Sequence, residues 1–352
     1  MRPHGAQGWL ANAPAFAGQG MQCTVVIENS NSRKEVRRTM DVTELDSLRI
    51  VLDPIGQAGV AIALMMVMFS VALGLRVDDF RFLLEKPLLF AGGVVSQVLL
   101  LPLVTIGLIF LMAPPPSIAL GMIVVACCPG GAVSNLLTYL SRGDLAVSVA
   151  LTTTSSLLAA ILTPASILFW SNAYEPTSTL LKSLDVSPYV FLAQTTLLLA
   201  VPLILGMIIA AKAPDVAQKI RKRATLLGAS TLIGVIIYGI VYFFPVLITA
   251  LPMLGFVVVI HNAVAFATGA AAGRVLSAST PTRRALVFEL GIQNAGLALV
   301  ILIGQLKGLG GAAAIAAVWG VWDLIAGGSI AVFFRFLDQR RTAEYDVETA
   351  IE

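Results

Sequence analysis

Long, uninterrupted apolar runs constrain what this chain can fold into more than any other feature of its sequence. A helix that crosses the bilayer core needs about 20 such residues at 1.5 Å each. Nine segments meet this length, at residues 52–75, 88–113, 117–141, 144–170, 188–211, 224–248, 251–273, 283–305 and 311–337. Because the runs do not alternate between apolar and polar residues, transmembrane β-strands are excluded. The sequence predicts an all-α polytopic membrane protein with nine transmembrane helices.

Composition excludes several other classes of protein. Apolar residues make up 57% of the chain and charged residues 12%, whereas soluble domains average roughly half and a quarter. Basic residues occupy short loops and form no continuous patch, so nucleic acid is not an expected partner. Three cysteines and two histidines show no metal-ligand spacing, and HExxH and paired aspartates are absent from the spans. We therefore expect no enzyme and no cofactor.

Lys and Arg predict the orientation. The loops between the predicted spans fall into two alternating sets, one with fifteen Lys and Arg residues and the other with two. The set with fifteen is expected on the cytoplasmic side. The poorer set is Lys182 and Lys307; the richer set is Arg76, Arg81, Lys86, Arg142, Lys212, Lys219, Arg221, Lys222, Arg223, Arg274, Arg283, Arg284, Arg335, Arg340 and Arg341. The C-terminus is then cytoplasmic, with a tail at 338–352, and the N-terminus lies outside, in what we expect to be a bacterial inner membrane.

The first residues conflict with this orientation. Residues 33–38 are strongly basic and resist translocation, and residues 1–39 lack a signal-peptide pattern, whereas the stretch from Met40 is acidic. We expect residues 1–50 to be a disordered or mis-started N-terminal segment, with 1–39 disordered or absent from the natural product. The membrane domain is expected at 51–337.

Two of the predicted spans are interrupted. The third contains Pro129-Gly130-Gly131, and the eighth contains Gly291 and Gly296 around Gln293-Asn294. Proline removes a backbone donor and glycine loosens a helix. Each break lies about 12 residues, or roughly 18 Å, from one end of its span, which is near the bilayer midplane. Matching breaks in two halves of a chain indicate a midplane site in a carrier with inverted repeats.

Polar residues collect at these breaks. Glu289 is an acid inside a span, with Gln97, Ser134, Asn135, Ser148, Thr152, Gln293 and Asn294 at similar depth. No Lys or Arg is expected there, so a cation is the natural partner, and oxygen ligands favour Na⁺ over softer metals. Taken singly, the hydroxyls could bond their own helix, Gln97 could join two helices and Glu289 could be protonated. His261-Asn262 could equally cap a helix or line a cavity.

At these residues the sequence resembles the bile acid:sodium symporter superfamily. The likeness covers about residues 50–337 and is carried by three motifs: Cys127-Cys128-Pro129-Gly130-Gly131 with Ser134-Asn135 and Gly143-Asp144; Glu289-Leu290-Gly291-Ile292-Gln293-Asn294-Ala295-Gly296; and Met68-Phe69-Ser70 onward to Leu75. The resemblance implies crossing discontinuous helices, a core (88–170 and 251–337) and a panel (52–75 and 188–248). It also implies a repeat of four plus five helices.

The resemblance further implies two sodium sites. One would use Ser134, Asn135, Ser148, Thr152 and Glu289, and the other Gln97, Glu289, Gln293 and the carbonyls of Leu290 and Ile292. The helix N-termini at the two breaks favour an anionic group near Ala132, Val133, Asn294 and Ala295, the family's pattern places substrate contact at Asp323, and Asn262 is a further candidate for substrate contact. Bacterial relatives usually have Thr or Asn in place of Ala132, and often Trp-His-Asn where this chain has Trp322-Asp323-Leu324, so bile acids are poor candidates.

These observations predict a sodium-coupled symporter of a small organic anion or zwitterion, working by alternating access. The alternative is a sodium-independent or proton-coupled exporter or exchanger on the same fold, with Glu289 and Asp323 as proton sites. For Asp323 three roles stay open: an ionised group that selects against a second carboxylate, a protonated donor to a carboxylate, or a purely structural bond to a neighbouring helix.

Overall fold

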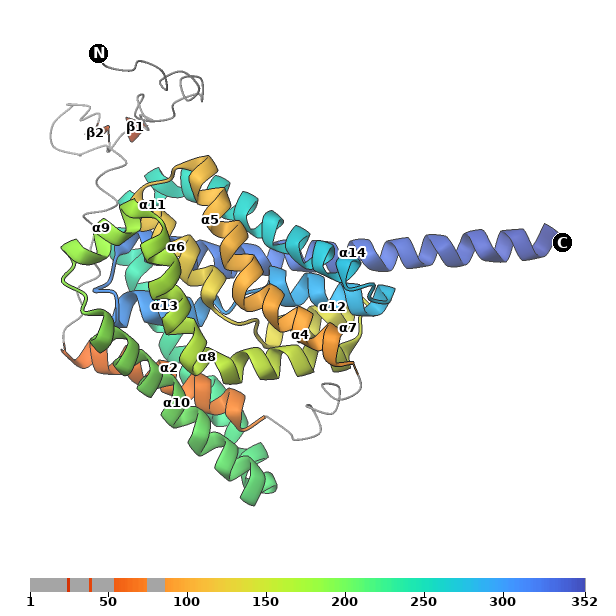
Figure 1. The fold of residues 1–352 in the computed structure, drawn as a ribbon, viewed down its shortest axis with the longest axis horizontal. Coiled ribbons are helices and arrows are strands. Elements are labelled where there is room, and N and C mark those ends of the chain that lie inside the picture. The colour runs from red at the N-terminus through yellow and green to blue at the C-terminus, as the bar shows by residue number, and fades with distance from the viewer. Residues whose placement is uncertain (1–23, 26–37, 40–53, 75–85, 352) are drawn as a thin grey trace, which may run out of the picture.

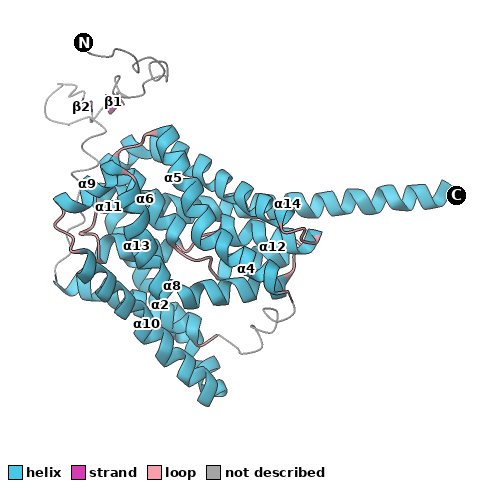
Figure 2. Ribbon diagram, viewed as in Figure 1, coloured by secondary structure: helices cyan, strands magenta, loops and turns pink. Residues whose placement is uncertain are grey.

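The computed structural model describes residues 24–25, 38–39, 54–74 and 86–351. Within them the secondary structure is helical, apart from two strands of two residues each, β1 (Thr24–Val25) and β2 (Arg38–Thr39), which pair antiparallel (Figure 2). The predicted all-α class is confirmed. Apart from this strand pair, the expectation for residues 1–50 lies outside the described residues.

The helices follow one another along the chain (Figure 1). Their bounds are α2 (Pro54–Ala72), α4 (Pro87–Val95), the π-helix η2 (Ser96–Leu100), α5 (Leu101–Met112), α6 (Pro116–Cys127), α7 (Ala132–Leu140), α8 (Leu145–Ala173), α9 (Glu175–Ser183), α10 (Pro188–Lys212), α11 (Pro214–Val275), α12 (Thr280–Gly291), α13 (Ala295–Gly304) and α14 (Gly310–Ile351). The short helix α9 lies in a segment for which the sequence predicts only a connection.

Among the described residues, six helices or helix runs are long and apolar enough to cross a membrane. A seventh span results if α6 and α7, which meet at a bend of 68°, are counted as one. Gly56–Ala72 is a further apolar helix of shorter length. The chain is thus an integral membrane protein, while nine spans and inverted repeats stay predictions.

The sequence predicts separate helices at 224–248 and 251–273; the structure assigns one helix across that boundary, and its part Ala250–Val275 is by itself long and apolar enough to cross a membrane. The structure has one continuous helix, α11, of 62 residues. Residues 246–251 contain no Gly, Asn or charged residue that would favour a turn, and prolines at 245 and 252 flank this stretch. The two parts of α11 contact different neighbours: Gly228 lies against Val67 of α2, and Gly269 against Leu286 of α12.

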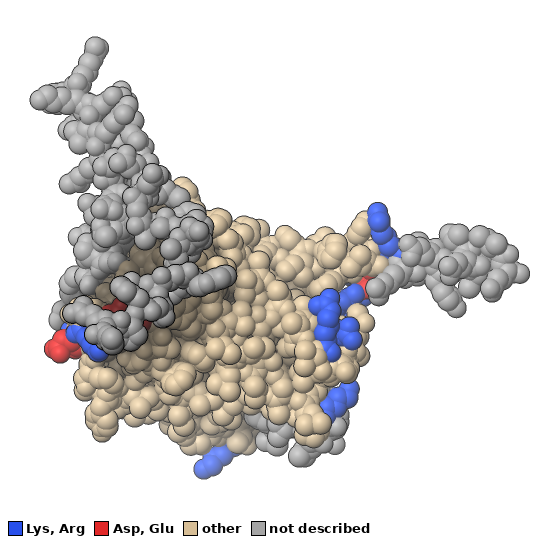
Figure 3. All heavy atoms as spheres, turned by 45° about the horizontal axis from the view of Figure 1, so that its top comes forward, with Lys and Arg blue, Asp and Glu red and all other residues tan. Residues whose placement is uncertain are grey.

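Most of the Lys and Arg visible on one face of the molecule lie at one end (Figure 3). Lys and Arg gather where α14 leaves the helical body, and the surface between the two ends is mostly uncharged (Figure 3). The predicted tail at 338–352 continues α14 as a helix through Ile351 and extends away from the body (Figure 1). Such a band of uncharged surface is what a bilayer requires.

Small residues bring the helices into close contact. Gly206 of α10 lies against Ala72 of α2, and Gly121 of α6 lies against the backbone of Ala312 on α14. A β-carbon at Gly121 would lie 2.8 Å from the Ala312 carbonyl oxygen and 3.0 Å from its Cα. Helices in lipid associate through this kind of packing, because lipid and Leu are equally apolar.

We predict that Gly121→Ala destabilises the protein, because backbone atoms of α14 cannot move aside as a flexible side chain can. The expected cost is about 1–3 kcal/mol, typical of overpacking. Thermal unfolding in detergent measures it. Gly107→Ala on α5 is the matched control, since a β-carbon there meets nothing within 4 Å. Equal unfolding temperatures for the two variants would contradict the close α6–α14 packing.

Candidate functional site

Two broken helices meet in the middle of the molecule. The first break separates α6 from α7 at residues 128–131, and the second separates α12 from α13 at residues 292–294. The backbone N–H of Asn294 donates to the carbonyl of Pro129 over 2.9 Å. The predicted discontinuities are therefore present, and they contact each other directly.

Side chains from neighbouring helices and from the second break itself bind carbonyl groups at the ends of the broken helices. At the end of α6, Thr163 donates to the Cys127 carbonyl over 2.9 Å and Gln97 donates to the Cys128 carbonyl over 3.0 Å. At the end of α12, Gln293 donates to the Leu290 carbonyl over 2.7 Å. A helix terminus buried in an apolar region needs such partners.

Glu289 lies at the centre of the crossing and is 1% exposed. Its Oε2 accepts hydrogen bonds from Ser134 Oγ at 2.9 Å and Thr152 Oγ1 at 2.7 Å. Its Oε1 has no hydrogen-bond partner among the described residues and faces the backbone of Gly130, where a β-carbon would lie 2.6 Å away. The carboxylate thus joins α7, α8 and α12, and one of its oxygens is left over.

Asn135 extends this cluster. Its Oδ1 accepts from Ser148 Oγ at 2.8 Å and from Thr152 Oγ1 at 3.2 Å. Asn135 is half-buried, whereas Ser134 and Ser148 are fully buried. The five residues expected at the first sodium site therefore form one hydrogen-bonded group, and Asn135 is its most accessible member.

The second expected set gathers around Gln97. Its Nε2 donates to Gln293 Oε1 over 2.9 Å as well as to Cys128, and its own Oε1 has no partner among the described residues. Gln97 lies in the π-helix η2, a distortion that is frequent at functional sites. Pro102 explains it, because proline has no N–H for the carbonyl four residues earlier and the hydrogen bonding shifts by one residue.

The first cluster has more acceptors than protons. The single proton of Ser134 is within reach of both the Gly131 carbonyl (2.7 Å) and Glu289, and that of Thr152 is within reach of both Glu289 and Asn135. The unpartnered Glu289 Oε1 adds a further acceptor. A cluster of hard oxygens with a net negative charge is the environment that a hard cation prefers.

Four of the six residues expected to contact substrate lie at the starts of α7 and α13. Ala132 is exposed, while Val133, Asn294 and Ala295 are half-buried. Asn294 caps α13, since its Oδ1 accepts from the Leu297 N–H at 2.9 Å. The first N–H groups of each helix carry partial positive charge, so this accessible part of the crossing suits an anionic group.

Asp323 and Asn262 occupy more enclosed positions. Asp323 is 4% exposed on α14, one turn after Gly320, which packs against Ala295, so it faces the crossing. Asn262 is fully buried on α11, and its Nδ2 donates to the Gly291 carbonyl over 2.8 Å. Substrate contact by either residue stays a prediction.

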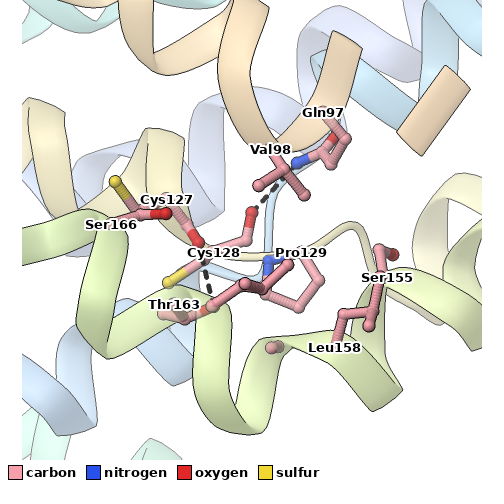
Figure 4. Close-up of a pocket in the computed structure, with 11 residues that line it drawn as sticks. Gln97, Val98, Cys127, Cys128, Pro129, Ser155, Leu158, Thr163 and Ser166 are labelled. Atoms are coloured by element: carbon pink, nitrogen blue, oxygen red, sulfur yellow. Dashed lines mark hydrogen bonds between the residues drawn. The ribbon is translucent and has the colours of Figure 1, made fainter. Parts of the chain in front are cut away.

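A small cavity adjoins Gln97, between η2, the first break and α8 (Figure 4). Its volume of about 20 Å³ holds one water molecule, and its lining includes Cys128, Pro129, Ser155 and Thr163. The sequence analysis missed Ser155 and Thr163. The signal was present, because both continue the face of α8 that begins with Ser148 and Thr152 at helical spacing.

A membrane-embedded crossing of two broken helices, lined with polar groups, is the architecture of a secondary transporter. Comparison with known proteins identifies which kind. The Sodium Bile acid symporter family matches residues 61–246. The chain belongs to this family.

Curated relatives agree with the match. "Uncharacterized sodium-dependent transporter YocS" of Bacillus subtilis is 33% identical over 284 residues, covering 78% of this chain and 82% of its own. "Ileal sodium/bile acid cotransporter" of Homo sapiens is 28% identical over 241 residues, covering 68% of each chain. "Probable sodium/metabolite cotransporter BASS2, chloroplastic" of Oryza sativa subsp. japonica is 29% identical over 275 residues, 76% of this chain and 62% of its own.

Sodium-coupled transport is thereby supported at the level of the family, and the chain is a membrane transporter and not an enzyme. The resemblance that the motifs carry in the sequence is confirmed. The roles of the individual site residues stay predictions.

We predict that Asn294→Ala destabilises the protein by about 1 kcal/mol, because α13 loses its N-cap. Asn294→Ser is the matched variant, since its hydroxyl can still accept from the Leu297 N–H. Thermal unfolding without sodium or substrate measures the difference. If Ala and Ser at this position were equally destabilising, the hydrogen bond to Leu297 would not be what Asn294 contributes to the fold.

Proposed function

We propose that this protein is a sodium-coupled symporter of a small organic solute that works by alternating access. The observation that carries the proposal is the buried Glu289 carboxylate at the helix crossing. It is held by Ser134 and Thr152, and one of its oxygens is unpartnered among the described residues. A buried charge without a partner is costly, and a bound cation removes that cost.

Two sodium sites can share this carboxylate. The first is supported by the cluster of Ser134, Asn135, Ser148 and Thr152 around Glu289. The second is supported by the contacts of Gln97 and Gln293 at the two breaks, with the Leu290 and Ile292 carbonyls as further ligands. Because Glu289 belongs to both, binding at one site favours the geometry of the other.

A proton is a poorer partner for the cluster than a cation. Protonation of Glu289 would neutralise its charge but would add a single proton to a cluster in which several acceptors share each hydroxyl proton. A cation would instead use the surplus lone pairs of Glu289 and Asn135. This argument favours sodium coupling over the proton-coupled exporter or exchanger.

The packing of the helices supports alternating access. Helix α2 packs chiefly against α10 and α11, as members of one panel would. Helices α6, α7, α8, α12, α13 and α14 pack among themselves around the crossing, as a core would. Movement of residues 52–75 and 188–248 relative to 88–170 and 251–337 would expose the crossing to either side in turn. The Arg-rich end of the molecule would face the cytoplasm of a bacterial inner membrane.

The substrate that fits the crossing is a small zwitterion or anion. The N-termini of α7 and α13 favour a carboxylate near Ala132, Val133, Asn294 and Ala295. Asp323, one turn from Gly320 and so near Ala295, would attract an amino group at the other end of the same solute. The combination favours a zwitterion.

We predict that Glu289→Gln abolishes stabilisation by sodium, because both sites lose their shared charge. Sodium at about 100 times its Kd should stabilise the unaltered protein by about 2.7 kcal/mol relative to potassium. Sodium-driven uptake by the variant should fall at least about tenfold, equivalent to about 1.4 kcal/mol. Thermal unfolding in sodium and in potassium, at fixed pH, gives the comparison.

The matched control for this change is Glu175→Gln, which makes the same substitution at an exposed residue of α9. Its response to sodium should equal that of the unaltered protein. Sodium stabilisation of equal size in Glu289→Gln would show that Glu289 is not a ligand. Uptake driven by a pH gradient alone would favour the proton-coupled alternative.

We predict that Asp323→Asn changes which solutes are carried. Uptake of zwitterions should fall roughly tenfold relative to monoanions of equal size, because one buried charge pair is lost. Competition uptake with pairs of labelled solutes in proteoliposomes measures the ratio. An unchanged solute range together with an unchanged pH profile would leave Asp323 with a structural role only.

A further inference from the structure

Asn262 makes a long-range contact to the second break that the proposed sodium ligands do not explain. It lies on α11, is fully buried, and donates from Nδ2 to the carbonyl of Gly291 over 2.8 Å. Its Oδ1 has no partner among the described residues. Burying the amide oxygen without a hydrogen bond lowers the stability of the protein.

Gly291 is a residue whose carbonyl needs an outside partner. In a continuous helix that carbonyl would accept from the N–H of Ala295, but Ala295 donates to the Gln293 carbonyl over 2.9 Å instead. Gly291 also lies against the ring of Phe266, so that a β-carbon there would overlap the ring. The end of α12 is therefore packed closely on α11, with the Gly291 carbonyl directed at Asn262.

The direction of this carbonyl affects its neighbours. Ile292 has extended backbone angles, φ −106° and ψ 109°. In an extended chain successive carbonyls point to opposite sides. If Asn262 holds the Gly291 carbonyl toward α11, the Ile292 carbonyl is turned away from α11, toward the crossing where Gln97 and Gln293 lie.

The first break has a corresponding contact. There Gln97, on the helix that precedes the broken one, donates to the Cys128 carbonyl from 31 positions earlier. Asn262 donates to Gly291 from 29 positions earlier. In both places a buried amide from the preceding helix binds the carbonyl end of a broken helix and keeps one oxygen unpartnered among the described residues.

We propose that Asn262 is a positioning residue for the sodium site at the second break. It fixes the peptide between Gly291 and Ile292 through the Gly291 carbonyl, and so sets the direction of the Ile292 carbonyl, one of the two proposed as ligands; the other, of Leu290, is held by Gln293. This inference rests on the proposed sodium coupling. It replaces direct substrate contact as the role of Asn262.

The test compares Asn262→Ala with Thr268→Val. Thr268 is a buried residue on the same helix, and its hydroxyl donates to the Val264 carbonyl of its own helix. Thr268→Val therefore removes a buried polar group without changing a contact to the break. For Asn262→Ala we expect the sodium concentration at half-maximal uptake to rise roughly 10- to 100-fold, as for lost partners of metal ligands. Substrate affinity at saturating sodium should stay unchanged, and Thr268→Val should match the unaltered protein in both.

Asn262→Ser provides a second variant if Asn262→Ala does not fold. Serine keeps a donor of shorter reach. The sodium concentration that Asn262→Ser needs should be higher than that of the unaltered protein and, where Asn262→Ala can be measured, lower than that of Asn262→Ala. Sodium titrations of thermal unfolding, without substrate, give the same ranking independently of transport.

The outcomes separate the two proposals. If the unaltered protein is not stabilised by sodium, sodium coupling itself fails and the role of Asn262 fails with it. If the unaltered protein responds to sodium and the Asn262 variants respond at the same concentrations, sodium coupling stands and the positioning role is overturned. A change in substrate affinity alone would also overturn it, in favour of direct substrate contact.

Discussion

A helix that stops inside a bilayer leaves carbonyl oxygens with no water to bind, and this constraint explains the arrangement of the centre of the molecule. Two helices stop there, and the second break supplies part of what the first lacks, since the Asn294 N–H binds the Pro129 carbonyl. The remaining carbonyls take their donors from Gln97, Thr163, Gln293 and Asn262. The polar lining of the site is thus also what makes the breaks tolerable in lipid.

Within this arrangement one carboxylate connects three helices. Glu289 of α12 accepts from Ser134 on α7 and Thr152 on α8, and Thr152 also reaches Asn135. Hydroxyls are suited to this position because each can rotate its proton away and offer lone pairs instead. The same contacts can therefore hold the cluster together without an ion and accept one when it arrives.

The sequence was informative where local chemistry decides the outcome. Pro129-Gly130-Gly131 and the glycines flanking Gln293-Asn294 predict both breaks, and Glu289 stands out as an acid in an apolar run. The sequence was uninformative where tertiary contacts decide. Nothing local indicates that Thr163 binds Cys127 from 36 positions away, or that Asn262 binds Gly291. The π-helix at Gln97 had a signal in Pro102, but the long apolar run reads as a regular span. At the junction within α11 the apolar runs predict two helices, and the structure assigns one helix label across both.

The ends of α7 and α12 that lie away from the crossing are joined through Arg284. Arg284, near the start of α12, binds Asp338 of α14 through both carboxylate oxygens, at 2.8 and 2.5 Å, and donates to the Ser141 carbonyl after α7. Its guanidinium also lies 5.0 Å from the ring centroid of Phe334. A bidentate, largely buried pair of this kind fixes orientation as well as distance. With α7, α12 and α14 fastened together at one end, bending the broken helices would disrupt several buried contacts at once. Displacing α2 and α10 as a unit would break none of these contacts. The anchoring at Arg284 is therefore compatible with the proposed movement of whole helix groups around an intact crossing.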